Sequence, residues 1–465
     1  MSKININRCV RFWLLGSLLG SLAWGGMGCS SAVNQRDAYI TAYHTGDIVR
    51  AESALSAIIR EEIPPAKADS TSNDAAWLLL DRGTARFASG EVVLAIDDYR
   101  RAIDLMDFYS QDCAAETVGK LLLQDDLGAY AGEDFEQVLA RVYLALALLH
   151  TGDMGNAYAL LRQAEEWQQQ KREEYRNSPV KRCYALVENA VAKYLFAVLL
   201  EKQGDASNAA ILYGDTAALV DNAQLKREIG VCDAQILSPS GTASLNNRSC
   251  ATILVLCHNG NAPHKVSVLS DASVASTVAL EIFLGMQDID PAWSSLAGIQ
   301  APALRYWNNS QPLSTIASLD GIQKPLLPLY CVGETAAAQL DQQMPLIVAR
   351  GVARYLLRRG AVACANDQDP QMGALVDFAM FVANLHTKAD TRSWTTLPET
   401  IDVARYDTCE GKHRLTIQAA YMSPMAYELQ LSQGDLCVVS VFNIHPGVTT
   451  VQIPKRFLIT KGEGE

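Results

Sequence analysis

The chain has 465 residues, enough for two or three domains that each bury a core. Hydrophobic residues make up 49 % of it and charged residues 19 %, a composition that excludes an intrinsically disordered chain. The formal net charge is −12, which argues against nucleic acid as a partner because phosphate binding needs a basic surface. There are 11 cysteines, but none forms a CxxC pair or has zinc-finger spacing with histidine, so we expect no metal site.

The segment 1–28 has the layout of a secretion signal. A basic start, from Lys3 to Arg11, precedes an apolar segment at 12–24 that is too short for a comfortable membrane span. The segment ends in Gly28-Cys29. This arrangement resembles the signal of bacterial lipoproteins, in which small residues precede the cysteine that becomes lipidated and N-terminal.

The lipoprotein resemblance implies a signal peptide at 1–28, lipidation of Cys29, and a tether at 29–36. A thioether-linked diacylglycerol and an amide-linked acyl chain bury enough hydrocarbon for stable anchoring in a lipid bilayer. Ser30, rather than aspartate, follows the cysteine. By the same resemblance this favours the periplasmic face of the outer membrane. An ordinary secretion signal and an uncleaved anchor are the alternatives.

The stretch at 133–170 has the pattern of a helical hairpin. Its first half places apolar residues on one helical face, and Gly152 can adopt the left-handed conformation that ends a helix. Asp153 follows, a residue type that caps the N-terminus of the next helix. That helix carries Ala157, which is small enough for the two helices to approach closely.

The same turn pattern occurs four times along the chain. Glycine followed by an acidic residue ends an apolar run at Gly46, Gly90, Gly152 and Gly204. Alanine stands five residues after each glycine, and a large apolar or aromatic residue stands nine after it: Ala51, Ala95, Ala157, Ala209 and Leu55, Tyr99, Leu161, Tyr213. This pattern resembles the tetratricopeptide (TPR) repeat, whose helical hairpins stack into a solenoid.

The resemblance implies a TPR-like helical repeat domain at 37–230, with an insertion at 108–134. The glycines are 44, 62 and 52 residues apart, whereas the TPR period is about 34 residues, so the repeats must be divergent. An ordinary helical bundle whose turns happen to use glycine is the alternative.

The pattern of predicted strands and helices in the second half, 236–465, indicates an α+β domain with a mainly antiparallel sheet. We expect strands at 253–256, 266–269, 278–283, 414–419, 436–442 and 449–453, and helices at 336–359 and 372–386. The segment 290–328 is rich in Pro, Asn and Ser, so we expect a surface loop there. The predicted fold class is therefore multidomain α+β, with an all-α solenoid followed by an α+β domain.

If the chain is exported, its cysteines can form disulfides, because disulfides persist in an oxidising compartment. Cys250 and Cys257 lie at the two ends of a predicted strand, about 23 Å apart, and so cannot bond each other. No pairing of the others follows from their spacing, and buried free thiols are the alternative for most of them.

Several short segments resemble a family of uncharacterised bacterial tetratricopeptide-like lipoproteins. They are Tyr130-Ala131-Gly132-Glu133-Asp134-Phe135-Glu136, His258-Asn259-Gly260 with Ala262-Pro263 and Lys265, Ala389-Asp390-Thr391-Arg392-Ser393-Trp394 with Leu397-Pro398, and Ala404-Arg405. The resemblance covers nearly the whole chain. It implies an envelope lipoprotein and carries no catalytic activity with it.

No motif of a known catalytic class occurs in the chain: GxSxG, a Walker loop, a dinucleotide fingerprint and HExxH are all absent. His258 and His264 bracket a turn, and the simplest interpretation is two solvated side chains. Asp288 and Asp290 lack further oxygen ligands for a cation. We therefore expect no catalytic, cofactor or metal site.

Two charged clusters are candidates for binding. Arg350, Arg354 and Arg358 recur every four residues, which places them on one helix face, either as a dock for an acidic partner or as a solvated face. In Asp390-Thr391-Arg392-Ser393-Trp394, an arginine can pair with the carboxylate and stack on the indole. We expect this cluster to fix the start of the last strands.

The sequence as a whole predicts a membrane-anchored envelope lipoprotein that is not an enzyme. Its TPR-like hairpins would act as a protein–protein interaction scaffold through their concave surface. A peptidoglycan- or carbohydrate-associated accessory module for a cell-wall enzyme is the alternative.

Overall fold

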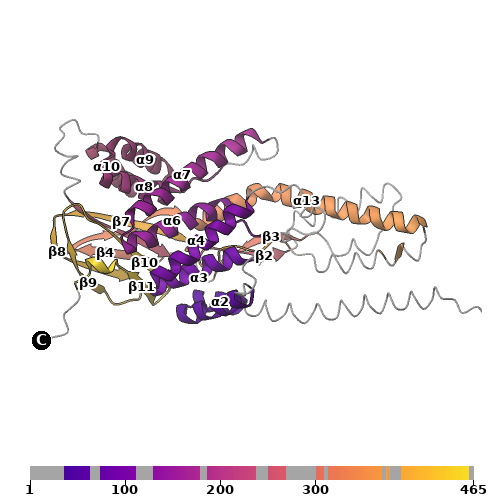
Figure 1. Cartoon of the computed structure of the whole chain (residues 1–465), viewed down its shortest axis with the longest axis horizontal. Coiled ribbons are helices and arrows are strands. Elements are labelled where there is room, and N and C mark those ends of the chain that lie inside the picture. The colour runs from indigo at the N-terminus through magenta and orange to yellow at the C-terminus, as the bar shows by residue number, and fades with distance from the viewer. Residues whose placement is uncertain are drawn as a thin grey trace, which may run out of the picture.

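The computed structural model describes residues 36–62, 74–110, 129–178, 186–236, 250–268, 300–307, 313–368, 373–374, 376 and 389–459. The protein is a mixture of helix and sheet, with a helical N-terminal region followed by sheets (Figure 1). The predicted signal peptide, the tether apart from residue 36, Cys29, most of the insertion at 108–134, Asp288 and Asp290 lie outside the described residues.

The helical region comprises a helix at 36–44 and eight further helices within the described residues. These are α2 (Ile48–Glu62), α3 (Ala75–Ser89), α4 (Val92–Tyr109), α6 (Asp134–Thr151), α7 (Met154–Asn177), α8 (Ala190–Gln203), α9 (Ala206–Leu219) and α10 (Ala223–Ile236). The predicted glycines lie between 36–44 and α2, α3 and α4, α6 and α7, and α8 and α9. The chain reverses direction at each of them, so the helices form four pairs.

Each turn glycine adopts the left-handed conformation, with φ between +86° and +90°. After the third and fourth turns, Asp153 and Asp205 accept a hydrogen bond from the backbone N–H three residues on. The alanines five residues after the glycines and the large residues nine after them are all fully buried. In the second pair, Tyr99 packs directly on Gly83, where an added Cβ would lie 2.7 Å from the tyrosine ring.

The C-terminal region forms three sheets. Its strands are β1 (Ala251–Asn259), β2 (His264–Val268), β3 (Ala301–Arg305), β4 (Thr315–Leu319), β5 (Ile322–Pro325), β6 (Leu327–Cys331), β7 (Thr400–Thr408), β8 (Gly411–Ala419), β9 (Met425–Leu431), β10 (Leu436–His445) and β11 (Val448–Gln452). The strand orders are β11-β10-β1-β7-β6, β2-β3 and β5-β4-β8-β9. Every pairing is antiparallel except that of β1 with β10, which is parallel.

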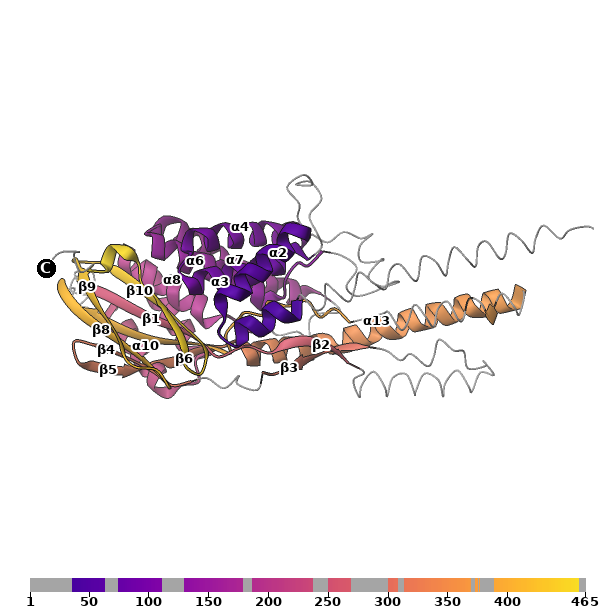
Figure 2. The same cartoon turned by 90° about the horizontal axis from the view of Figure 1, so that it is seen from below.

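The five-stranded sheet is the middle of three layers (Figure 2). Leu254 and Leu256 of β1 belong to a core shared with the helices, whereas Ile253 and Val255 belong to a core shared with the four-stranded sheet. This alternation follows from the period of two along a strand. Because helices and sheet share one core, the predicted boundary near residues 230–236 separates two kinds of secondary structure rather than two independent cores.

The expectation of a surface loop at 290–328 is wrong for much of its length. This segment contains β3, β4, β5 and the start of β6. Among its described residues, Pro302, Pro325 and Pro328 stand in β3, β5 and β6. Asp320 and Gly321 link β4 to β5 in a tight turn, with φ of +50° and +89°. The predicted strands at 253–256, 414–419 and 436–442 lie within β1, β8 and β10. The strand expected at 278–283 lies outside the described residues.

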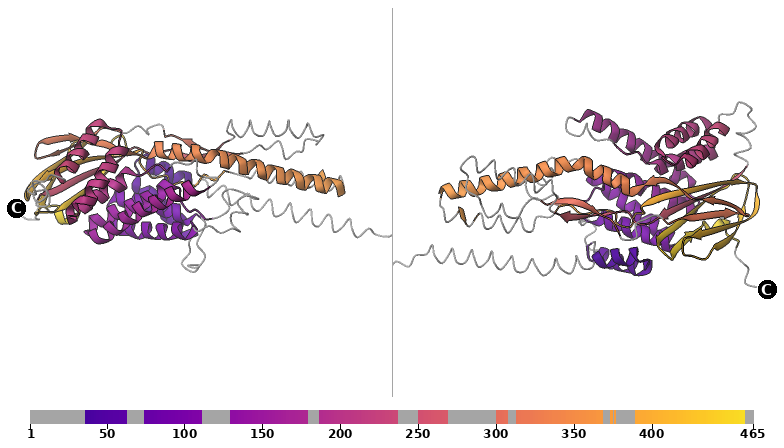
Figure 3. Two further views of the ribbon diagram at one scale, coloured as in Figure 1. Left: turned by 90° about the horizontal axis from the view of Figure 1, so that it is seen from above. Right: turned by 180° about the vertical axis from the view of Figure 1, so that it is seen from behind.

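One long helix, α13 (Val332–Gln368), projects from the body of the molecule (Figures 1 and 3). Its 37 residues correspond to about 55 Å. Its N-terminal end packs against β3 and β7. In the part of the chain that the structure describes, no helix combines the length and apolarity needed to cross a bilayer.

Candidate functional site

Three segments that are far apart in the sequence meet at one place, which we call the junction: residues 130–136, 258–265 and 389–398. Lys265 forms an ion pair with Glu133. The backbone N–H of Ala262 donates to the carbonyl of Leu397 at 2.9 Å. The junction thus joins the start of α6, the turn after β1 and the segment that leads into β7. These are the segments on which the family resemblance rests.

Glu136 and Trp394 form the centre of the junction. The fully buried Glu136 carboxylate accepts the backbone N–H of Trp394 at 2.7 Å, the hydroxyl of Tyr130, and the N–H of Glu133 at 2.8 Å. Burial raises the pKa of Glu136. The Trp394 indole N–H donates to the hydroxyl of Thr84 in α3 at 3.1 Å. One of these four bonds joins Glu136 to Trp394, and the other three connect the pair to the segment before α6 and to α3.

A second carboxylate, Asp81 in α3, holds the residues that follow the tryptophan. It accepts the N–H and hydroxyl of Thr396 at 2.9 and 3.0 Å, the hydroxyl of Thr395 at 2.9 Å, and that of Tyr39 at 2.8 Å. Burial raises the pKa of Asp81 to about 7, against the lowering effect of these hydrogen bonds. Each carboxylate oxygen has two donors, so Asp81 acts as a clamp on the 389–398 segment.

The predicted Asp390–Arg392 pair is present, but its aromatic partner differs. Arg392 donates to both carboxylate oxygens of Asp390, at 2.9 and 2.7 Å. Its guanidinium lies 5.7 Å from the ring centre of Tyr130 rather than on Trp394. Trp394 is 2 % exposed and packs against Tyr99 and Tyr143 instead. The Trp394 indole therefore lies in the helical core. The local sequence around Trp394 does not predict this position.

The expectation that both histidines are solvated is wrong for His258, and His264 is half-buried. The His258 ring is buried, lies 2.9 Å by Nδ1 from the Tyr143 hydroxyl, and stacks on Phe442 at 4.4 Å. Burial lowers its pKa to about 3, so the ring is neutral. His264 stacks on Trp307 at 4.5 Å, and burial lowers its pKa as well. His258 therefore lies in β1 against the helical core, whereas His264, the first residue of β2, packs on an aromatic ring.

A small pocket opens beside the junction, with an empty volume of about 420 Å³ that includes open solvent at its mouth. Its walls are Phe135, Leu304, Leu340, Trp394 and Leu397, together with polar groups of the junction and α13. The polar groups bond one another: the Glu133 carboxylate accepts Lys265, Gln339 at 2.8 Å and Gln343 at 3.0 Å. These bonds occupy the acid and the amine with structural partners, which disfavours a role in acid–base chemistry.

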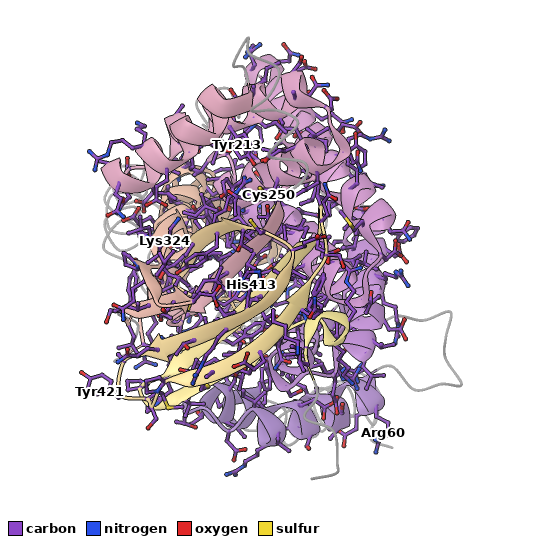
Figure 4. All side chains as sticks on the ribbon, turned by 90° about the vertical axis from the view of Figure 1, so that its left-hand side faces the viewer. Arg60, Tyr213, Cys250, Lys324, His413 and Tyr421 are labelled. Atoms are coloured by element: carbon purple, nitrogen blue, oxygen red, sulfur yellow. The ribbon has the colours of Figure 1, made fainter. Side chains whose placement is uncertain are left out.

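A further buried ion pair joins the last helical pair to the sheet. Arg405 of β7 donates to both carboxylate oxygens of Glu201 in α8, at 2.9 and 2.8 Å, and to the Tyr213 hydroxyl at 2.8 Å. Asp407, two residues on, also accepts from Arg405 and from the Thr252 hydroxyl at 2.6 Å. Tyr213 is visible at this end of the molecule in Figure 4.

The C-terminal segment runs along the row of hairpin turns. A Cβ added at Gly46 would lie 2.6 Å from Val448, one at Gly90 would lie 3.0 Å from Gln452, and one at Gly152 would lie 3.1 Å from Arg456. The contacting residues step by four as the chain passes from turn to turn. Thr450 and Gln452 also donate to the carbonyl of Ala88, both at 2.8 Å. The chain itself therefore covers these three turns.

The arginine series on α13 is not a uniform solvated stripe. Arg354 is 5 % exposed and Arg350 is half-buried, whereas the side chain of Arg358 lies outside the described residues. The four-residue spacing does place the backbone positions on one helix face, but that face is partly covered. The middle of the predicted acidic-partner dock is therefore not available at the surface.

Sequence reasoning missed Asp81, Glu201 and Tyr143. Asp81 and Glu201 each directly follow a run of apolar helix residues. An acidic residue at the end of such a run indicates a buried polar contact. Tyr143 gives no such signal, because a tyrosine on an apolar helix is ordinary core. Among the described residues, no three His, Cys, Asp or Glu side chains are grouped so as to hold a metal ion.

Comparison with known proteins found no matching family model, no matching curated protein and no matching solved structure.

Proposed function

We propose that the chain is a lipid-anchored protein of the bacterial cell envelope that acts as a non-catalytic interaction scaffold. In this proposal its helical pairs are divergent TPR-like repeats, as in the uncharacterised lipoprotein family that it resembles. Support for the repeats comes from the four left-handed turn glycines and the buried residues at matching offsets after them. The bonding of the junction carboxylates supports a structural rather than a catalytic role.

The observation that carries the proposal is the difference between the two helices in the second, third and fourth pairs. Nearly every residue of α3, α6 and α8 is buried, because the chain's own sheet and the 389–398 segment cover them. In α4, α7 and α9 only one face is buried. The first helices of these pairs are therefore covered by the chain itself, and we assign the outer face of the second helices to a partner.

That outer face carries exposed apolar side chains at equivalent positions. Val49 and Val93 each stand three residues after a turn glycine and are 72 % and 67 % exposed. Leu94 and Ile211 are also exposed on α4 and α9. Large exposed apolar side chains at matching positions of neighbouring pairs favour a protein partner over a carbohydrate, which needs polar and aromatic contacts.

Site-specific photocrosslinking in the native envelope tests the scaffold. A photoreactive residue at Val93 should give a discrete protein adduct. The same residue at Ile322, 66 % exposed on β5, serves as the matched control and should not give that adduct. Identical adducts at both positions would remove the outer face as the docking surface. Recovery of peptidoglycan fragments alone would support the accessory-module alternative.

The anchor has its own test. Cys29→Ala should move the protein from the membrane fraction to the soluble fraction, because the acyl chains supply the hydrocarbon that holds it there. Fractionation with a carbonate wash, followed by immunoblotting, measures this change. Retention of the variant in washed membranes would indicate a different anchor.

A further inference from the structure

Six cysteines of the described residues are free thiols: Cys250, Cys257, Cys331, Cys364, Cys409 and Cys437. Two of them, Cys250 and Cys409, stand at one end of the five-stranded sheet. Cys250 immediately precedes β1, and Cys409 immediately follows β7. Cys250 is half-buried and Cys409 is exposed, so a solvent oxidant can reach this end of the sheet (Figure 4).

The register of β1 and β7 sets these two cysteines opposite each other. The strands are antiparallel, and their pairs include Thr252 with Asp407 and, last, Ala251 with Thr408. The ladder ends there, and the same register continued by one step places Cys250 opposite Cys409. Both backbones are held there, since Lys202 donates to the Cys250 carbonyl at 2.9 Å and the His413 Nε2 lies 2.9 Å from the Cys409 carbonyl oxygen.

The two side chains also share one face of the sheet. Side chains alternate along a strand, so Cys250 points to the side of Thr252, and Cys409 to the side of Asp407. On that face the neighbouring pair is in direct contact, with the Thr252 hydroxyl 2.6 Å from Asp407. Directly opposite residues of an antiparallel pair have Cβ atoms about 4.5–5.5 Å apart, which meets the upper end of the disulfide range.

No other pair of the six has such a relation in the sheet. Cys257 faces Asp402, Cys437 faces Ile253, and Cys331 faces Thr400. Cys257 and Cys437 lie on adjacent strands but four residues out of register, which is about 13 Å along the strand. Backbone movement would be needed to bond them.

We propose that Cys250 and Cys409 form a disulfide when the protein meets a disulfide oxidant. One cysteine thiolate attacks the oxidant's disulfide, which gives a mixed disulfide and releases one oxidant thiol. The other cysteine thiolate then displaces the second oxidant thiol and closes the Cys250–Cys409 bond. Two protons and two electrons pass to the oxidant, so its disulfide becomes two thiols.

The bond would staple the ends of β1 and β7 beside the Arg405–Glu201 ion pair, where the last helical pair meets the sheet. It closes a long loop, from Cys250 to Cys409, that contains β2 to β6 and α13. Crosslinks that close long loops restrict the unfolded chain strongly. The oxidised protein should therefore unfold at a higher temperature than the reduced protein, by several degrees.

Peptide mapping of the full-length protein tests the pairing. The protein is equilibrated with oxidised glutathione, its remaining thiols are alkylated, and trypsin is added without reductant. The expected product joins peptide 249–265 to peptide 406–412. Peptide 249–265 also contains Cys257, so the linked product must persist in Cys257→Ser and disappear in Cys250→Ser.

Thermal unfolding gives the second readout. Oxidation should raise the Tm of the wild type and of Cys257→Ser, and leave that of Cys250→Ser unchanged. Quantitative alkylation of Cys250 in oxidised wild-type protein would overturn the proposal without any variant. So would a linked peptide that survives Cys250→Ser and is lost in Cys257→Ser. Neither result bears on the scaffold function, which does not depend on this bond.

Discussion

At the scale of single residues, stability depends on ionisable side chains that are buried and hydrogen-bonded. Asp81, Glu136 and Arg405 sit in apolar surroundings, and each is bonded to groups from a distant part of the chain. Leaving such a group without its partner costs several kcal/mol, whereas the intact arrangement fixes one geometry. The polar contacts therefore specify how the 389–398 segment and β7 sit on the helices.

The raised pKa of Asp81 predicts how the free energy of unfolding depends on pH. Its folded pKa of about 7 lies above the usual aspartate value, so between pH 4 and 7 the folded protein holds a proton that the unfolded chain has released. This contribution to the free energy of unfolding is complete below pH 4 and is lost as the pH rises through 7. A shift of about three pKa units corresponds to about 4 kcal/mol at most.

Asp81→Asn should remove that dependence while it keeps the size of the side chain. Urea unfolding of wild type and variant between pH 4 and 8 measures the difference, which should change by up to about 1.4 kcal/mol per pH unit between pH 4 and 7. Comparing the two proteins cancels the titration of His44, whose pKa burial lowers to about 4, and of Glu399. Parallel profiles would show that Asp81 does not titrate in this range.

At the scale of elements, each helical pair depends on a turn residue in the left-handed backbone conformation, which glycine adopts without steric strain. Gly90 has a φ of +90°, and Gln452 approaches to 3.0 Å of the position that a Cβ would occupy. The backbone conformation and the covering C-terminal segment thus act together. Gly90 is thus favoured for two reasons: its left-handed backbone conformation, and the close approach of β11, which lies near the other end of the chain.

Gly90→Ala should cost about 1–2 kcal/mol in the free energy of unfolding, because a left-handed alanine is strained. Gly214→Ala is the matched control: Gly214 lies within α9, and nothing stands within 4 Å of its added Cβ. That substitution should stabilise the helix by about 0.5–1 kcal/mol. Urea midpoints of the two variants should therefore move in opposite directions, and equal shifts would contradict the turn geometry.

At the scale of the whole molecule, the helices and the five-stranded sheet share one hydrophobic core. The core that includes Leu79 and Leu146 of the helices also includes Leu256, Val438 and Phe442 of the strands. Helices α3, α6 and α8 have almost no polar face left to offer to water. Without the sheet, the helical region would expose a large apolar surface.

We therefore expect residues 36–236 alone to fail as an independent domain. The fragment should bind a hydrophobic dye and unfold without a cooperative transition, whereas residues 36–465 should unfold in one step. Near-ultraviolet circular dichroism during thermal unfolding compares the two. A cooperative, dye-free fragment would establish two separable domains instead.

The local features of the fold can be predicted from the sequence because their causes are local. The turn at Gly152, the cap at Asp153 and the buried face around Ala157 are set by residues within a few positions of one another. The same holds for β1 and β8, whose hydrophobic patterns stand alone. The expectation for 290–328 fails because Pro, Asn and Ser are compatible with both loops and edge strands.

The candidate site can be predicted only in pieces. The Asp390–Arg392 pair is local and follows from the sequence, but the burial of Trp394 against Tyr99 and Tyr143 depends on helices from the first third of the chain. The sequence favours a surface position for His258 because a turn after a strand is usually solvated. The parallel pairing of β1 with β10 is equally nonlocal.

Local patterns in the sequence are enough to predict that helical pairs turn at four glycines and that strands follow them, since helix periodicity and turn chemistry act over a few residues. In contrast, these local patterns do not predict that the chain's own sheet covers α3, α6 and α8. That outcome depends on strand order, on which face of β1 meets the helices, and on buried carboxylates that find donors in distant parts of the chain. Such contacts are chosen by the packing of the whole chain and leave no periodic signal in it.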